Sequence, residues 1–123
     1  MNKDPLSEKV IGAAIEVHRV LGPGLLESAY EKCLCHELAE RRLVFERQVP
    51  VPVSYKGIAI ECGYRADLVV ERALLVELKA VEKILPIHHA QVLTYLRLSG
   101  IRTGLLMNFN TKVLKDGIKR FVV

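Results

Sequence analysis

The stretch YRADLVVERALLVELKA, residues 64–80, decides the fold of this chain. It contains two apolar runs, 64–70 and 74–80, whose high content of leucine and valine is typical of buried strands. The three residues between the runs, 71–73, are few enough for a tight hairpin loop. The stretch therefore predicts two buried, antiparallel strands joined by a hairpin.

Three charged side chains interrupt these apolar strands. Pairing of Val70 with Leu74 across the loop would place Asp67 directly opposite Glu77. Because strand side chains alternate between faces, Lys79 lies on the same face as Glu77. Two ionised carboxylates with Cβ atoms roughly 4.5–5.5 Å apart repel each other unless a cation lies between them.

Two interpretations of these charges remain open. In the first, Asp67 or Glu77 forms a structural ion pair with Lys79 or Arg65. In the second, the carboxylates bind a hard divalent cation, Mg²⁺ or Mn²⁺, with Lys79 beside it. Carboxylate oxygens suit these ions, and the chain has no thiolate cluster that would favour zinc.

Length and composition limit the class of protein. The 123 residues predict a single domain, 1–123, of ordinary globular composition, and no apolar stretch is long enough to cross a membrane. Cys33, Cys35 and Cys62 are odd in number and lack metal-ligand spacing, which predicts reduced thiols in a cytoplasmic protein. The net charge of +4 is weakly in favour of a polyanionic partner such as nucleic acid.

Helical spacing of apolar residues predicts three helices. Asp4 or Ser7 caps the first, and the Gly-Pro-Gly turn at 22–24 ends it. The second spans about 25–41 and the third 86–99. The expected buried stripe of the second helix consists of Leu26, Tyr30, Cys33 and Leu34.

Further strands complete the expected sheet. Residues 44–55 alternate in hydrophobicity and predict one edge strand, because Pro50 and Pro52 have no N–H to donate. The other predicted strands span 58–60, 104–109 and 118–123. The order of elements predicts an α/β (α+β mixed) fold, with a central mixed β-sheet flanked by helices on both faces.

Other polar residues occur at apolar positions of the predicted helices. Glu27 shares a side of the second helix with apolar residues, which would hold it at the edge of the core, although a helix N-terminus also favours an acid. His88, Gln91 and Tyr95 share one face of the third helix, where they could bind phosphate or position a water, or form a polar seam. His18 is interpreted as a core histidine with its hydrogen bonds satisfied.

The segment GLLESAY, residues 24–30, matches the motif that names the GxxExxY family, a branch of the PD-(D/E)XK nuclease-like superfamily. The chain resembles this family over essentially its whole length. The matching segments also include residues 21–24, 45–50, 64–68, 76–80 and 91–95.

This resemblance implies a restriction-endonuclease-like core and Mg²⁺-dependent hydrolysis of phosphodiester bonds, with Mn²⁺ able to replace Mg²⁺. Asp67 and Glu77 would bind the metal, Glu27 would complete the site, and Lys79 would assist the attacking water. Lys79, Glu77 and Asp67 would be the catalytic set, and Glu27, Asp67 and Glu77 the metal ligands. Ala66 departs from the proline in the name of the superfamily.

The resemblance also bears on the substrate. Gln91 and Tyr95 match the Gln-x-x-x-Tyr motif of RecB-like nucleases, and with His88 they form the expected substrate-binding set. The predicted partner is nucleic acid, DNA in preference to RNA, with no membrane. Because the chain is short, three alternatives remain open: weak sequence selectivity, action on particular structures or ends, or specificity supplied by a homodimer or a partner protein.

The sequence therefore predicts a metal-dependent nuclease. A nucleic-acid-binding module of the same fold, with little or no turnover, is the alternative. A third hypothesis is a structural protein that assembles through its sheet edge, against which Pro50 and Pro52 argue.

Overall fold

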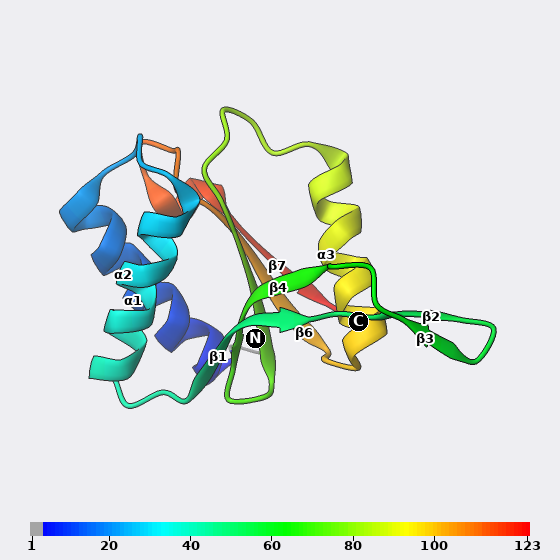
Figure 1. The fold of residues 1–123 in the computed structure, drawn as a ribbon. Helices are drawn as coiled ribbons and strands as arrows, with labels where there is room; N and C mark the ends of the chain where they lie inside the picture. The colour runs from blue at the N-terminus through cyan, green and yellow to red at the C-terminus, as the bar shows by residue number, and fades with distance from the viewer. Residues whose placement is uncertain (1–3) are drawn as a thin grey trace.

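The computed structural model describes residues 4–123, which fold into a sheet between two helical layers. Helices α1 and α2 cover one face of the sheet and α3 covers the other (Figure 1). The helices are α1 (Pro5–Leu21), α2 (Glu27–Glu40) and α3 (Pro86–Ser99), with a short 3₁₀ helix at Leu114–Gly117. The strands are β1 (Phe45–Pro50), β2 (Val53–Tyr55), β3 (Ile58–Ile60), β4 (Arg65–Val70), β5 (Leu74–Lys79), β6 (Thr103–Asn108) and β7 (Ile118–Val122).

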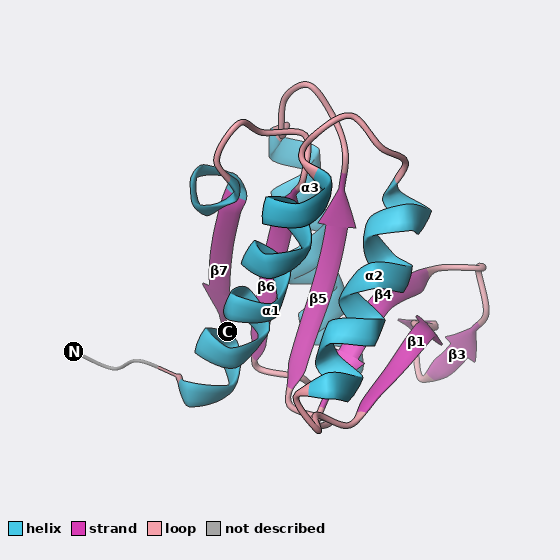
Figure 2. Ribbon diagram, turned by 90° about the vertical axis from the view of Figure 1, so that its left-hand side faces the viewer, coloured by secondary structure: helices cyan, strands magenta, loops and turns pink. Residues whose placement is uncertain are grey.

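Five strands form the main sheet in the order β1-β4-β5-β6-β7, which can be followed in Figure 2. All neighbours are antiparallel except β5 and β6, which are parallel and joined through α3. Val70 pairs with Leu74, so the register expected for the hairpin is confirmed. The mixed α/β architecture predicted from the sequence is also confirmed.

Strand β5 lies in the middle of the sheet and is buried on both faces. Its residues Leu74, Val76 and Leu78 pack into the cluster formed with α1 and α2, and all are at most 1% exposed. Leu75 faces the opposite way, into the cluster formed with α3. Burying a leucine or valine side chain contributes roughly 1.5–3 kcal/mol, so this strand anchors the charged residues at its end.

The predicted ends of α1 and α3 agree with the structure. Asp4 caps α1 by accepting a hydrogen bond from the N–H of Leu6 (3.1 Å). Gly22 and Gly100 end α1 and α3 with φ values of 70° and 77°, a region that glycine adopts without strain. His18 is a buried core histidine, as interpreted, because its Nε2 lies 2.8 Å from the carbonyl oxygen of Thr111.

Two expectations about local structure were wrong. Residues 44–55 do not form one strand: the chain leaves the β1–β4 ladder after Val51, and β2 pairs with β3 in a separate sheet. Leu26 is not part of the buried stripe of α2: it is 77% exposed, since it is the extended residue that precedes the helix. Tyr30 and Leu34 of that stripe are fully buried.

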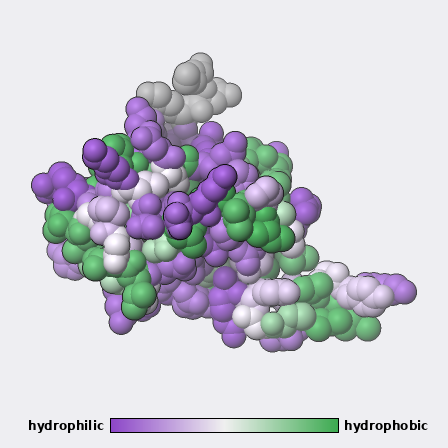
Figure 3. All heavy atoms as spheres, turned by 90° about the horizontal axis from the view of Figure 1, so that it is seen from above, coloured by the Kyte–Doolittle hydropathy of each residue, from purple (hydrophilic) through white to green (hydrophobic). Residues whose placement is uncertain are grey.

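Strands β2 and β3 form a separate hairpin that projects away from the main sheet (Figure 1). Its turn at Lys56 and Gly57 has positive φ at both residues, 51° and 81°, as a two-residue hairpin turn of type I′ requires. The hairpin carries exposed apolar side chains, including Tyr55 and Ile58, and this part of the surface is visible at the right of Figure 3.

Two further observations concern the whole of residues 4–123. The three cysteines are free thiols, in agreement with the prediction that they are reduced. No helix in this part of the chain combines the length and the hydropathy needed to cross a membrane.

Candidate active site at the end of strand β5

The β4–β5 ladder opens at the position of the two acids. The pair farthest from the hairpin loop is Leu68 with Val76. Beyond this pair, backbone N–H groups donate to carboxylate side chains of the opposite strand instead of to its backbone carbonyl groups. The backbone N–H of Asp67 donates to Oε1 of Glu77 (2.9 Å), and the N–H of Leu78 donates to Oδ2 of Asp67 (2.8 Å). The two carboxylates are therefore held between diverging strands, each bonded to the opposite strand.

Burial and nearby negative charges raise the pKa values of both acids. Glu77 is 4% exposed, and its burial together with the negative charge of Asp67 raises its pKa to about 8. The pKa of Asp67 is also raised, chiefly by burial, and the charges of Glu31 and Glu27 act in the same direction. The positive charge of Lys79 opposes the shift at Glu77 without cancelling it. The pair therefore retains protons at pH values where ordinary carboxyls have lost them.

The structural ion pair offered as an alternative does not form. Arg65 pairs with Glu61 instead (3.2 Å). Within residues 4–123, no ion pair joins Lys79 to Asp67 or Glu77. The acids are therefore not neutralised by a direct cationic partner, and their raised pKa values reflect this.

Helix α2 brings a further acid to the end of β5. Glu27, in its first turn, is exposed, and its Oε2 accepts a hydrogen bond from the N–H of Ala80 (3.3 Å). Glu27 and Asp67 line the same open cavity of about 360 Å³. The structure thus brings Glu27 to the site where the sequence predicted it.

A second acid of α2 was missed in the sequence. Glu31 is only 7% exposed, and its Oε2 accepts a hydrogen bond from Nη2 of Arg47 (2.9 Å). Its Oε1 accepts a hydrogen bond from Nε2 of Gln48 (2.8 Å), and the same amide lies 3.4 Å from Oδ1 of Asp67. The spacing of Glu31, four residues after Glu27, was the available signal that both share a face of α2. This network links the helix to the carboxylates through the edge strand.

Asn108 fixes the backbone of the segment that follows β5. This residue was not predicted from the sequence to belong to the site. Asn108 is 3% exposed; its Nδ2 donates to the carbonyl oxygen of Val81 (2.9 Å) and its Oδ1 accepts from the N–H of Val81 (3.1 Å). These paired hydrogen bonds hold the backbone directly after Lys79 and Ala80 in one position.

The predicted substrate-binding residues gather on the other face of the sheet. Lys79, His88, Gln91 and Tyr95 line one cavity of about 390 Å³. Nε2 of Gln91 donates to Oη of Tyr95 (3.1 Å). Burial raises the pKa of the Tyr95 hydroxyl, and the negative charge of Glu77 raises it further. The hydroxyl therefore lies within electrostatic range of this acid. His88 also accepts a hydrogen bond from the N–H of Leu85 at Nδ1 (3.0 Å), which caps α3.

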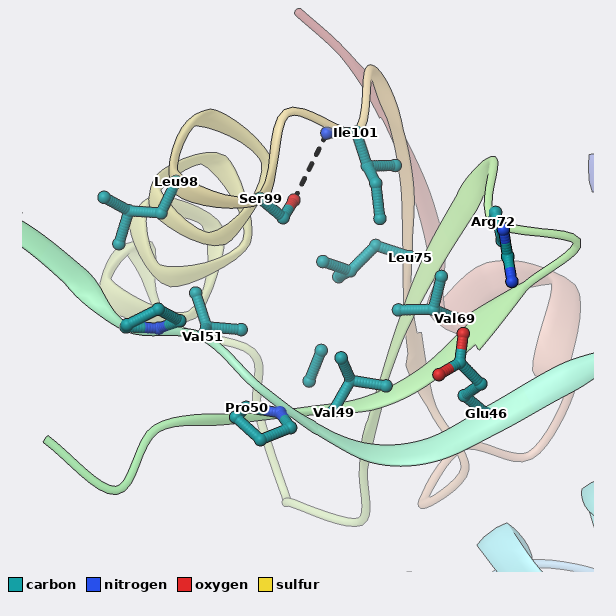
Figure 4. Close-up of a pocket in the computed structure, with 12 residues that line it drawn as sticks. Glu46, Val49, Pro50, Val51, Val69, Arg72, Leu75, Leu98, Ser99 and Ile101 are labelled. Atoms are coloured by element: carbon teal, nitrogen blue, oxygen red, sulfur yellow. Dashed lines mark hydrogen bonds between the residues drawn. The ribbon is translucent and has the colours of Figure 1, made fainter. Parts of the chain in front are cut away.

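A third cavity, of about 440 Å³, lies between β1, β4, β5 and the end of α3 (Figure 4). Its walls are mainly apolar, with Val49, Val69 and Leu75 on the sheet side and Glu46 and Arg72 at its rim. None of the predicted site residues lines it. We therefore assign the candidate active site to the end of β5 and not to this cavity.

The donor chemistry at the end of β5 fits a hard divalent cation. All the donors are carboxylate oxygens, and a cation between Asp67 and Glu77 would relieve the repulsion that contributes, after burial, to the raised pKa of Glu77. In this conformation the carboxylates accept main-chain hydrogen bonds, and no group of three or more His, Cys, Asp or Glu side chains among residues 4–123 is arranged to hold a metal ion. Each of the two carboxylates still has one oxygen, Oε2 of Glu77 and Oδ1 of Asp67, outside these main-chain hydrogen bonds and available to an ion.

Comparison with protein families agrees with this geometry. The family model described as "PD-(D/E)XK nuclease superfamily" matches residues 4–121. The chain belongs to this superfamily. Its five-stranded mixed sheet and three α-helices are consistent with the restriction-endonuclease-like fold of PD-(D/E)XK nucleases. Comparisons with curated proteins and with solved structures gave no match.

Membership of this superfamily bears on the chemistry as well as on the fold. It suggests nuclease activity and a nucleic acid substrate, and PD-(D/E)XK nucleases generally use divalent metals. The acids and the lysine described above occupy the end of the central hairpin of this fold.

Proposed function

We propose that this chain is a divalent-metal-dependent nuclease that hydrolyses phosphodiester bonds of nucleic acid. The proposal rests on the pair Asp67 and Glu77, which are held between diverging strands and both have raised pKa values. Lys79 lies one strand period beyond Glu77, on the same face. The motif at residues 24–30 further supports a place in the GxxExxY branch.

In this proposal Asp67 and Glu77 hold Mg²⁺, for which Mn²⁺ can substitute, and Glu27 completes the ligand set. When bound, such an ion lowers the pKa of a coordinated water and neutralises charge that develops on the phosphate. A contact of Glu27 supports this role: its carboxylate accepts a hydrogen bond from the N–H of Ala80, the residue after Lys79.

The remaining residues of the site bind the substrate and orient the reacting groups. Lys79, with its side chain in the cavity on the α3 face, assists the attacking water and balances negative charge in the transition state. Gln91 and Tyr95, together with His88, bind the substrate, DNA in preference to RNA. Asn108 is a positioning residue, because it fixes the backbone that follows Lys79.

A cleavage assay tests the proposal. Single-stranded DNA, duplex DNA, forked DNA and RNA would each be incubated with the protein and Mg²⁺, Mn²⁺ or EDTA. We expect cleavage of at least one substrate with a divalent ion, none in EDTA, and none with Glu77→Ala or Lys79→Ala.

Lys115→Ala is a matched control, because Lys115 is exposed and lies outside the cavities at the end of β5. Its loss removes the same charge and should leave cleavage unchanged. If wild-type protein cuts no substrate above the Glu77→Ala background yet binds nucleic acid, the chain is a binding module of the same fold.

A further inference from the structure

The cavity on the α3 face extends beyond the residues assigned to hydrolysis. It is bounded by Lys79 at one side and by Tyr64, the residue before β4, at another. Ile87, from the first turn of α3, also lines it. Its volume of about 390 Å³ lies in the range of pockets that bind small ligands.

An exposed aromatic ring forms one wall of this cavity. Tyr64 is 47% exposed, although its ring packs at 6.1 Å from the ring of Tyr95. Ile87 is 67% exposed and adds apolar surface. Exposed aromatic and apolar side chains that line a cavity beside a charged site offer a surface on which a flat apolar ligand can pack.

The floor of the cavity offers one donor and one acceptor. Because Nδ1 of His88 accepts the N–H of Leu85, the neutral ring carries its proton on Nε2 and can donate there. Because Nε2 of Gln91 donates to Tyr95, the amide presents Oε1 as an acceptor. A planar ligand with hydrogen-bonding edges matches both the walls and the floor.

We propose that this cavity binds an unpaired nucleobase of the strand being cut, stacked on Tyr64, so that the substrate is a single-stranded segment of nucleic acid. The inference rests on the proposed function, since Lys79 lines the cavity and places the backbone of that nucleotide at the acids. In a duplex the faces of the bases are covered by their neighbours, whereas an unpaired base can leave the stack and lie on an aromatic side chain.

Binding measurements test the proposal separately from cleavage. A fluorescein-labelled strand of twelve thymidines would be titrated in Ca²⁺ and followed by anisotropy, with a gel to verify that it stays intact. We expect Tyr64→Ala and Tyr64→Leu to bind about tenfold more weakly or worse, the size of one lost base–aromatic stack. Tyr64→Phe keeps the ring and should bind like wild type.

Tyr55→Ala is the matched control, because Tyr55 is also an exposed tyrosine (56%) but lies on the projecting hairpin and not in the cavity. It should bind like wild type. A strand with abasic sites should bind wild type about tenfold more weakly, and Tyr64→Ala should then make no further difference. The comparison of normal and abasic strands with the wild-type protein does not depend on the folding of any variant.

Equal binding of abasic and normal strands by wild type would overturn the proposal, as would equal losses for Tyr64→Ala and Tyr55→Ala. Binding of a duplex as tight as that of the single strand would also overturn it. The two proposals fail in different ways. Base-dependent binding without cleavage in Mg²⁺ refutes the proposed nuclease activity and supports the base-binding role of the cavity. Cleavage without base-dependent binding supports the nuclease activity and refutes the base-binding role.

Discussion

The most quantitative prediction concerns Glu77 in the metal-free protein. Its ordinary pKa is 4.5, and burial with the charge of Asp67 raises it to about 8 in the folded state. An acid with a raised pKa contributes stability that is fully present below pH 4.5 and is lost as the pH rises through about 8. Each pKa unit corresponds to about 1.4 kcal/mol. The free energy of unfolding should therefore fall by up to ~5 kcal/mol across this window.

Glu77→Gln removes this dependence while keeping the shape of the side chain. The amide oxygen can still accept the N–H of Asp67, and the group no longer ionises. We expect the variant to be about as stable as wild type at pH 5 and several kcal/mol more stable at pH 8, within the limit of ~5 kcal/mol. Glu82→Gln, at an exposed acid in the loop after β5, should follow the wild-type curve.

Urea denaturation in EDTA at pH 5, 6, 7 and 8, monitored by circular dichroism, measures these differences. Adding Mn²⁺ at pH 8 should raise the stability of wild type and leave Glu77→Gln nearly unchanged. If the curves of wild type and Glu77→Gln run parallel from pH 5 to pH 8, the pKa of Glu77 is not raised in the folded protein.

Three further predictions follow from the contacts around this pair. Glu27→Gln should leave the melting temperature of the metal-free protein unchanged or higher, and should reduce its rise on adding Mn²⁺; an undiminished rise would remove Glu27 from the ligand set. Gln91→Ala should lower activity or nucleic-acid affinity with little change in melting temperature, whereas a loss of several degrees with activity per folded molecule retained would indicate a structural role. Asn108→Ala leaves the backbone groups of Val81 without partners, so urea denaturation should show a loss of roughly 1–3 kcal/mol and cleavage should slow; unchanged stability would contradict the positioning role.

Much of the fold was predictable because local signals were strong. The apolar runs and the three-residue loop determine the β4–β5 hairpin and its register, which brings Asp67 and Glu77 together. The break between β1 and β2 was not predicted, because hydrophobic alternation continues through Pro50 and Pro52 and does not reveal that β2 pairs with β3 and not with β4.

The network around Glu31 shows where local sequence signals end. Glu31, Arg47 and Gln48 meet only because α2 packs over the edge strand, and no periodicity encodes that approach. Gln48 also has a φ of 50°, uncommon for a non-glycine residue in a strand, which the alternating pattern could not reveal. The acids on β4 and β5 were predictable; the residues that orient them required the tertiary structure.

The central claim is that Asp67 and Glu77 together hold a divalent cation. Anomalous diffraction from a crystal soaked in Mn²⁺ tests this claim most directly. We expect a peak within bonding distance of carboxylate oxygens of both Asp67 and Glu77. A peak elsewhere, or no peak at a saturating Mn²⁺ concentration, would show that the two residues do not hold the ion.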